Sequence, residues 1–416
     1  MLMTRKGTPR FVPLLAALAM LSAPAAAQDI GMLCTESPND SFDLQATSGY
    51  IQTPDGNSIF MWGFAPTAGF FQIPGPVLCV TEGDTVSVSL TNNLLEPVSI
   101  VFPGQQGVSA SEAAAPSSNG LLTLEAEPGG TVNYSFTASA PGTYLYESGT
   151  MRHKQIHMGL YGVLVVRPAL GPNFAYNDPD TAFSEEFLLV LHEIDSDLHR
   201  AVELGQTFDQ TTRRDRYWTI NGRSMPDTIQ ANFPFFPLLP SQPFGALVRV
   251  EAIDRNDGVT DPDPILIRYA NAGTVNHPFH PHGDHLLIIA QDGRLLGEAQ
   301  VEAFTRTIAA GQTFDLLFTW ENVEAWRTTE QEGNGPMPVQ VPGLQNLVFK
   351  DDVTFYSGDE HLGFKDTLPP AVTSFNECGE FYFPWHSHAL HTVQNFDEGF
   401  GGMLTLLRID PPGGCP

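Results

Sequence analysis

The chain has 416 residues and is strongly acidic: 47 Asp and Glu stand against 20 Lys and Arg, and the net charge is −27. Because this charge repels nucleic acid and anionic membrane surfaces, neither is expected as a partner. The 38 Gly and 34 Pro, together with short runs rich in Val, Ile, Phe and Thr, predict an all-β protein rather than a helical one.

The chain begins with the pattern of a secretory signal. Arg5, Lys6 and Arg10 precede a short apolar run at 11–21, and the small residues of APAAA follow. We interpret residues 1–27 as a signal peptide, because the apolar run is too short to span a bilayer and leads into a cleavage-site pattern. The mature protein is therefore expected to be periplasmic or secreted, with no membrane anchor.

All four cysteines follow this segment, and no two of them have CxxC spacing. Export to an oxidising compartment therefore predicts two disulfides rather than a zinc knuckle or a redox dithiol. The sequence leaves all three pairings open. The cysteines are Cys34, Cys79, Cys378 and Cys415.

Two parts of the chain share one pattern. Residues 78–104 and 247–283 each read as a strand, a turn, a second strand and an extended approach to a glycine. Asn92 aligns with Asn271, and no gap separates this pair from the final glycine of each segment. A repeat of this kind predicts a duplicated β-sandwich.

A second match aligns residues 128–166 with later pieces of the chain and sets Glu147 against His386. The second copy is longer, and its additional residues are rich in Gly, Pro and acidic residues, which is typical of a surface insertion. The predicted division is a signal peptide at 1–27, an N-terminal domain at 28–168, a linker at 169–184, and a C-terminal domain at 185–416 with an insertion near 321–377.

Seven of the twelve histidines fall in two short windows, HPFHPHGDH at 277–285 and WHSHALH at 385–391. Side chains two residues apart on a strand point to the same side, so each window predicts a same-face pair of imidazoles. Because imidazole is the commonest metal ligand, we predict a metal site rather than histidines on a solvated loop. The two pairs are His280 with His282 and His386 with His388.

The first copy of the repeat has no histidines at the matching positions. Val98, Val101 and Pro103 occupy the places of the three histidines of HPFHPH at 277–282. The first copy is therefore not expected to form an equivalent site from these positions.

The remaining histidines carry weaker signals. His285 is interpreted as a surface imidazole or one beside the ligands, and Asp284 is a candidate for orienting a ligating ring. His192, His199 and His361 are isolated in the sequence and are interpreted as ordinary surface or partly buried side chains. No GxSxG, P-loop, GxGxxG or HExxH motif occurs, so hydrolase, nucleotide-binding and zincin functions have no support.

Several motifs together resemble the multicopper oxidases, a laccase-like family of cupredoxin proteins. They are PGPVL at 74–78, NGR at 221–223, HPFHPHG at 277–283, AGQTFDLL at 310–317, and WHSH with GGM at 385–403. The resemblance implies two cupredoxin-like Greek-key β-sandwich domains and copper as the cofactor. It also implies a small-molecule or metal-ion electron donor, dioxygen as the acceptor, and a homotrimer, since two-domain members commonly assemble in this way.

The resemblance also assigns ligands residue by residue. It implies that His277 belongs to a mononuclear blue copper site, and that His391 and Met403 are further ligands of that site, although both depart from the usual spacing. Zinc or iron would also suit such imidazoles. The implied ligands of the oxygen-reducing cluster in this half are His280, His282, His386 and His388.

The departures from the family pattern are informative. Ser387 stands where the family has a copper-binding Cys, and a hydroxyl is not a soft thiolate, so no ordinary blue site is expected. The first half lacks the family's imidazoles and has Glu147 at one of their places, either as a carboxylate ligand or as a carboxylate at a strand end. His153 and His157 are candidate replacements if a loop rearranges.

We therefore expect an exported copper-binding protein of this family, with an oxidoreductase role and an altered copper centre. The alternative is a non-enzymatic metal-binding or structural cupredoxin scaffold that has lost oxidase activity. The sequence leaves the substrate and the number of bound metal ions open.

Overall fold

The computed structural model describes residues 29–112, 123–254, 260–322, 346–348, 354–359, 362–365, 367–396 and 398–415. The predicted signal peptide lies outside these residues, as do His361 and most of the predicted insertion. The described residues lie mainly in strands and loops, so the expectation of an all-β protein is confirmed.

The first part of the chain supplies eight strands and one short helix. They are β1 (Ser41–Gln52), β2 (Ser58–Pro66), β3 (Leu78–Thr81), β4 (Thr85–Asn92), β5 (Ser109–Glu112), β6 (Thr131–Thr137), β7 (Gly142–Glu147), α1 (Arg152–Gln155) and β8 (Tyr161–Arg167). One sheet has the order β2-β1-β4-β6-β5, and the other has the order β3-β8-β7.

The second part supplies the remaining described elements. They are β9 (Glu186–Ile194), α2 (Ser196–Glu203), β10 (Tyr217–Ile220), β11 (Val248–Ile253), β12 (Ile265–Asn271), β13 (His277–Pro281), β14 (Leu286–Gln291), β15 (Arg294–Leu295), β16 (Val301–Ala303), β17 (Arg306–Ile308), β18 (Thr313–Phe318), β19 (Trp320–Glu321), β20 (Asn346–Val348), β21 (Thr354–Tyr356), β22 (Phe381–Ser387) and β23 (Leu404–Asp410). One sheet runs β10-β9-β12-β18-β14-β15, with β16 also paired to β14, and another runs β17-β13-β22-β23-β11-β19. The strands β20 and β21 pair separately.

Short 3-10 turns connect some of these elements. They lie at Pro179–Thr181, Gln210–Thr212, Asp227–Ile229, Gly297–Ala299 and Leu390–Val393. Among the described residues, the helices are all too short or too polar to cross a bilayer.

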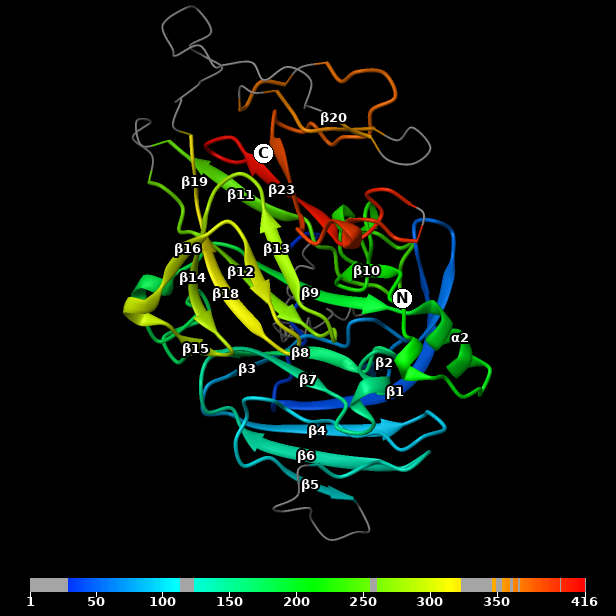
Figure 1. Cartoon of the computed structure of the whole chain (residues 1–416). Helices are drawn as coiled ribbons and strands as arrows, with labels where there is room; N and C mark the ends of the chain where they lie inside the picture. The colour runs from blue at the N-terminus through cyan, green and yellow to red at the C-terminus, as the bar shows by residue number, and fades with distance from the viewer. Residues whose placement is uncertain are drawn as a thin grey trace, which may run out of the picture.

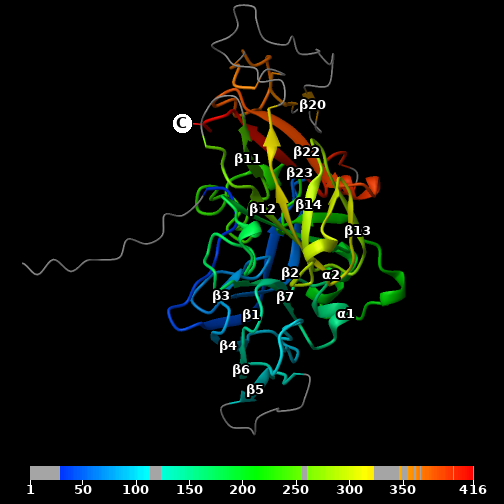
Figure 2. The ribbon, with the colours of Figure 1, turned by 90° about the vertical axis from the view of Figure 1, so that its left-hand side faces the viewer.

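The four larger sheets stack as layers along the molecule, from β5 and β6 at one end to β11 and β23 near the other (Figures 1 and 2). One apolar core lies within the first pair of sheets and another within the second pair. A third core joins strands β7 and β8 to β9, β10 and β12, and we call this contact between the two pairs the seam. Two stacked sandwiches are thus present, while the domain boundaries given above remain a proposal.

Burial along the strands follows their place in the stack. In β4 the valines at 86 and 88 and Leu90 are buried while the serines between them are partly exposed, because the outer sheet has one face on the core and one towards solvent. All seven residues of β12 are buried, because its sheet is covered by the seam on one face and by the second core on the other.

The repeat predicted from the sequence is confirmed by two matching asparagines. Asn92 ends β4 and donates from Nδ2 to the carbonyl of Glu96 at 2.8 Å. Asn271 ends β12 and donates from Nδ2 to the carbonyl of Val275 at 2.8 Å. The two side chains close the same loop in each copy.

The second match in the repeat is confirmed by strand pairing. Val101 pairs with Glu147 in an isolated antiparallel bridge, and His280 pairs with His386 between β13 and β22. These are the residues that the two sequence matches set against each other. The first half therefore contains the same structural position, but no imidazoles stand there.

A buried charge network crosses the seam. Arg268 of β12 is fully buried and donates to Thr143 of β7 at 2.8 Å, to Asp315 of β18 at 3.2 Å, and to Glu186 of β9. Although burial opposes ionisation, Arg268 and Arg167 hold the pKa of Glu186 below its ordinary value. Arg268 thus reaches the first half through the Thr143 hydroxyl, and Glu186, which also pairs with Arg167 of β8, links the two halves through ionised groups.

Two disulfides are present, as predicted, and the structure decides the pairing that the sequence left open. Cys34 bonds to Cys79, and Cys378 bonds to Cys415. No free cysteine remains among the described residues.

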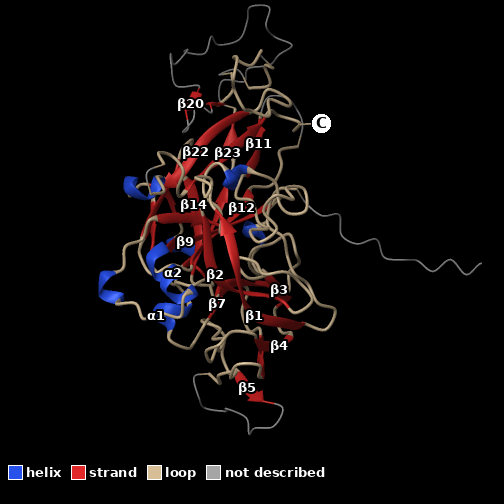
Figure 3. Ribbon diagram, turned by 90° about the vertical axis from the view of Figure 1, so that its right-hand side faces the viewer, coloured by secondary structure: helices blue, strands red, loops and turns tan. Residues whose placement is uncertain are grey.

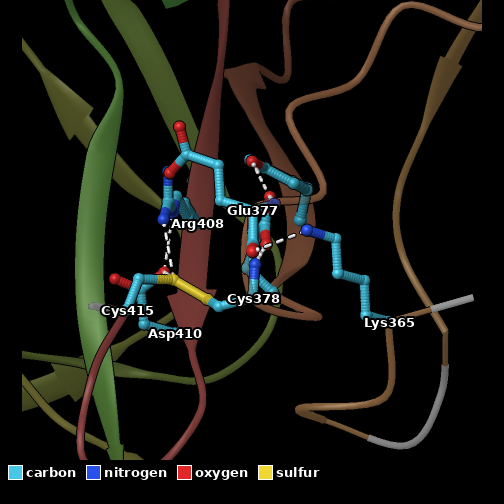
Figure 4. The surroundings of a disulfide bond; sticks show 8 residues. Lys365, Glu377, Cys378, Arg408, Asp410 and Cys415 are labelled. Atoms are coloured by element: carbon cyan, nitrogen blue, oxygen red, sulfur yellow. Dashed lines mark hydrogen bonds and ion pairs between the residues drawn. A yellow bond between two sulfur atoms is a disulfide. The ribbon is translucent and has the colours of Figure 1, made fainter.

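The second disulfide fastens the strand that carries the later histidines. Cys378 lies just before β22, and Cys415 lies beyond the end of β23. Figure 4 shows Arg408 beside the bridge, where it bonds to Asp410 at 2.6 Å and to Glu377 at 2.9 Å. The start of β22 is therefore held to the C-terminal strand by a covalent bond and by ion pairs.

Candidate metal centre

The two histidine windows meet on neighbouring strands. β13 and β22 are antiparallel neighbours in one sheet, and His280 stands directly opposite His386 in their ladder. The same-face pairs predicted from the sequence therefore lie side by side. We call His280, His282, His386 and His388 the outer histidine cluster, because their side chains lie on the face of the sheet away from the core.

The nitrogens of this cluster converge. Nε2 of His282 lies 3.1 Å from Nε2 of His386, and one ring nitrogen each of His280, His282 and His386 lies within 4.8 Å of the other two. The ring centroid of His388 is 4.8 Å from that of His280 and 5.9 Å from that of His386. Three imidazoles thus bring one nitrogen each towards a common point, and the ring of His388 packs beside them.

Two of the four rings are oriented by acceptors at their far nitrogen. Nδ1 of His280 lies 3.0 Å from the carbonyl of Phe304 and 2.6 Å from the hydroxyl of Thr305. Nδ1 of His386 lies 2.9 Å from the carbonyl of Ser387. Because a carbonyl only accepts, these Nδ1 atoms carry the protons, and each Nε2 keeps a free lone pair. This is the tautomer that metal-binding histidines use.

The environment favours the neutral form of three of these rings. Burial, together with the neighbouring rings of His386, His280 and His388, lowers the pKa of His282 to about 4. Burial also lowers the pKa of His280 and of His386, although nearby carbonyls oppose the shift. Since only the neutral ring donates a lone pair, the cluster is ready to bind a metal ion at neutral pH.

The cluster borders an open depression of about 360 Å³, lined by His280, His282, Asp284, His285, Phe304 and Phe383. His285 is exposed and packs against Phe304 with ring centroids 5.2 Å apart. A larger depression of about 650 Å³ lies elsewhere, between β2, α1 and α2, and no residue of the cluster lines it. We place the candidate site at the cluster, because the larger depression lacks a convergent set of ligands.

His277 points the opposite way from the cluster. It lies on β13 with the buried Phe279, and Ser387 is paired with Phe279, so His277 and Ser387 share the inner face of the sheet. Nε2 of His277 lies 3.4 Å from the carboxylate of Glu193, and the Ser387 hydroxyl is buried without a hydrogen-bond partner. Sequence reasoning missed Glu193, and no motif around it would have pointed to this role.

Of the other two residues assigned to a blue site, His391 shares a neighbour with His277, and Met403 lies in the core. His391 is exposed in the 3-10 turn Leu390–Val393, and its ring packs edge-on against Trp218 at 5.5 Å. Trp218 also packs edge-on against His277 at 6.0 Å. Met403 is fully buried in the second core, and its carbonyl accepts from the amide of Ser387. Their assignment as ligands remains a prediction.

The first-half candidates lie outside the outer histidine cluster. Glu147 is buried and paired with Arg152, and burial raises its pKa although Arg152 opposes the shift. His153 is exposed, and the described ring contacts of His157 are to two other histidines. The structure therefore does not bring these three side chains to the cluster.

The interpretation of His192 and His199 as ordinary surface or partly buried side chains is wrong. Both are fully buried, and both pack against His157. Strand β9 and helix α2 bring them together although neither stands in a histidine-rich window. Sequence reasoning missed this group because its members come from three separate elements.

Comparisons with known proteins agree with the motifs. The family model for multicopper oxidases matches residues 70–170. Copper resistance protein A of Escherichia coli is 26% identical over 257 residues, which cover 59% of this chain and 41% of that protein. L-ascorbate oxidase of Cucurbita pepo var. melopepo is 37% identical over 103 residues, which cover 24% of this chain and 18% of that protein. The chain is related to the multicopper oxidases.

Solved multicopper oxidases share the fold. A blue copper oxidase from Nitrosomonas europaea has a TM-score of 0.59 at 21% identity, covering 89% of this chain and 85% of that one. The multicopper oxidase mgLAC has a TM-score of 0.56 at 19% identity, covering 90% and 86%. The expectation of cupredoxin-like sandwiches is confirmed. The match covers only 41% of the length of copper resistance protein A. The likeness therefore does not assign that protein's activity to this chain.

The donor sets differ in how well they fit the copper of multicopper oxidases. The outer histidine cluster offers neutral imidazole nitrogens that already converge, which suits copper. The buried positions around Ser387 do not fit a blue copper ion, because no thiolate is present there. The donor set of the outer histidine cluster therefore suits copper, whereas the donor set of the predicted blue site does not.

Proposed function

We propose that the protein is an exported copper-binding member of the multicopper oxidase family, with an oxidoreductase role and an altered copper centre. The observation that supports this most is the convergence of His280, His282 and His386, with one nitrogen of each within 4.8 Å of the others. His388 completes a set of four imidazoles, and the ligand role of all four is part of the proposal.

Copper bound there would supply a one-electron redox couple. His280 and His386 hold their rings in the ligating tautomer through carbonyls, and the lowered pKa of His282 keeps its ring neutral, with a lone pair on one nitrogen. The open depression beside them leaves room for a small-molecule or metal-ion electron donor, and for dioxygen as the acceptor. Aromatic Phe304, at the rim, offers an apolar surface to such a donor.

Export and assembly are further parts of the proposal. A periplasmic or secreted location rests on the leader pattern at 1–27, and a homotrimer rests on the family resemblance alone. Light scattering of the purified mature protein measures the second: a mass of one chain would contradict it.

A non-enzymatic role is the second candidate. It is favoured by Ser387, which removes the thiolate, and by Val101 and Glu147, which stand where imidazoles would complete the cluster from the first half. In this case the scaffold would bind or deliver a metal ion without turnover.

Replacing His386 with alanine should remove copper from the centre. Mutating a residue that hydrogen-bonds to a metal ligand lowers metal affinity about 10- to 100-fold. Removing a converging ligand itself is therefore expected to lower the affinity at least about 100-fold. The measurement is copper per chain after loading and dialysis. His153→Ala is the matched control, because His153 is exposed and lies outside the outer histidine cluster. Equal copper content in both variants would refute the site.

Oxygen consumption separates the two functions. With a phenol, Cu(I) or Mn(II) as donor, an oxidoreductase should consume dioxygen steadily, and His386→Ala should abolish the consumption. Copper binding without turnover would favour the scaffold instead. Metal analysis of protein purified without added metal decides between copper and the alternatives, zinc and iron.

Copper should stay bound to a lower pH than exposed histidines would allow. An ordinary histidine has a pKa near 6.5, so its lone pair is lost to a proton below that value. The pKa of His282 is lowered to about 4, and those of His280 and His386 are also lowered, so their neutral forms persist as the pH falls. We expect little loss of copper on dialysis at pH 6 and progressive loss towards pH 4. Half-release near pH 6.5 would contradict the lowered pKa values of these three rings.

A further inference from the structure

Three other histidines meet at the seam. His157 lies between α1 and β8, His192 lies on β9, and His199 lies on α2; Figure 3 shows α1 and α2 on the same side of the molecule. The ring centroid of His157 is 5.8 Å from that of His192 and 5.4 Å from that of His199. At most 1% of each residue is exposed. We call these three residues the seam triad.

The seam triad leaves four buried ring nitrogens without a hydrogen bond. They are Nδ1 of His157, both nitrogens of His192, and Nε2 of His199. The carbonyls of Ile156 and His157 approach the rings of His192 and His199 without closing a bond of normal geometry. Buried polar atoms in folded proteins are nearly always paired, so a group of four such atoms calls for a partner.

The bonded nitrogens of the triad show the pattern of metal ligands. Nε2 of His157 lies 3.0 Å from the carboxylate of Asp215, and Nδ1 of His199 lies 2.6 Å from the carbonyl of Phe60. Carboxylates and carbonyls accept, so these nitrogens carry the protons, and the opposite nitrogen of each ring keeps its lone pair. Metal-binding histidines are oriented in this way by a carboxylate or a backbone carbonyl.

The separations of His157 from the other two rings are close to those on a shared ion. Metal–nitrogen bonds of about 2.0–2.1 Å place the centroids of two imidazoles on one tetrahedral ion about 5 Å apart. The observed separations of 5.4 and 5.8 Å are slightly longer. A change of about 10–15° in χ1, which displaces a whole ring and stays within a rotamer well, would close the difference.

The surrounding charges also favour a cation. A donor atom of Glu193 and one of Asp215 lie within 4.8 Å of His157 and of each other. Arg213 pairs with Asp215 at 3.1 Å and lies 3.9 Å from Glu193, which leaves one negative charge in excess. Burial lowers the pKa of His192 to about 4 and that of His199 well below its ordinary value, so both rings are neutral.

We propose that the seam triad binds a divalent first-row transition-metal ion through three imidazole nitrogens, as a second site separate from the outer histidine cluster. Three neutral imidazoles suit zinc well, and zinc is the probe chosen below. The site joins the two halves, since His157 belongs to the first and His192 and His199 to the second. It is also linked to His277, because Glu193 follows His192 on β9 and contacts that ring.

Zinc content measured without the outer histidine cluster tests the proposal. The full chain carrying His280→Ala and His386→Ala is produced with added zinc and dialysed, and we expect about one zinc ion per chain to remain. Adding His192→Phe, which keeps a ring against Tyr161, should remove the ion, while adding His153→Ala should not. Absence of zinc in the His280→Ala, His386→Ala protein, or an equal zinc content after His192→Phe, would overturn the proposal. Failure of the outer histidine cluster to bind copper would not affect this result.

X-ray diffraction from the wild-type protein tests the proposal without any substitution. Crystals of zinc-loaded protein measured on both sides of the zinc absorption edge should show an anomalous peak between the three rings. Ordered water without anomalous signal at that place would overturn the proposal, because water can also satisfy buried ring nitrogens.

Discussion

Replacing Arg268 with methionine is expected to lower the free energy of unfolding by about 3–5 kcal/mol, because it removes one partner of a buried ion pair. The guanidinium contacts Glu186 and Asp315 of the neighbouring strands beside the seam, and methionine fills much of its volume without replacing its charge. The carboxylates would stay buried with fewer partners, which is the costly outcome. Urea unfolding followed by tryptophan fluorescence measures the change.

The matched control is Arg249→Met. Arg249 pairs with Glu185, but 34% of the arginine side chain and 40% of the glutamate side chain are exposed. Exposed ion pairs contribute about 0–1 kcal/mol, so this variant should be nearly as stable as the wild type. A similar loss of stability in both variants would show that the buried network has no special role.

Copper-loaded wild-type protein is expected to lack the intense blue colour of thiolate-bound copper. Ser387 occupies the place of the family's Cys, and a hydroxyl provides no sulfur-to-copper charge transfer. The measurement is a visible absorption spectrum of protein with a known copper content. A strongly blue wild type would show that the ligand set deduced for this chain is wrong.

Ser387→Cys extends this prediction. The new thiol would lie on the buried face that also carries His277, close to the backbone of Met403, so copper-loaded Ser387→Cys should gain a thiolate-to-copper band. Ser387→Ala is the matched control and should stay colourless. No band in Ser387→Cys would contradict the predicted roles of His277, His391 and Met403.

The outer histidine cluster could be predicted from sequence because its geometry is local. Residues two apart on a strand face the same way, so each histidine window contained its own pair. The repeat then set Val101 and Glu147 against His280 and His386, and the pairing of the strands follows the same correspondence. The two-residue period of a strand and the internal repeat can both be read from the sequence. The geometry of the outer histidine cluster depends on these two features.

The seam triad could not be predicted in the same way. His157, His192 and His199 come from a loop, a strand and a helix, and no repeat or spacing relates them. Their meeting depends on how the two sandwiches dock, through apolar side chains that many arrangements would satisfy. The disulfide pairing was open for a related reason, since Cys378 and Cys415 are brought together by the pairing of β22 with β23.

Because β13 pairs directly with β22, the metal centre should tolerate insertions and deletions in the chain between these two strands. The indole of Trp385 donates to the carbonyl of His282 at 2.9 Å, although the two residues are 103 positions apart. A slip of one residue would turn Trp385 outward and the four imidazoles into the core, so the alignment of the strands is fixed by large side chains rather than by the chain between them. The connecting chain can therefore change in length, during evolution or by engineering, without moving the metal ligands.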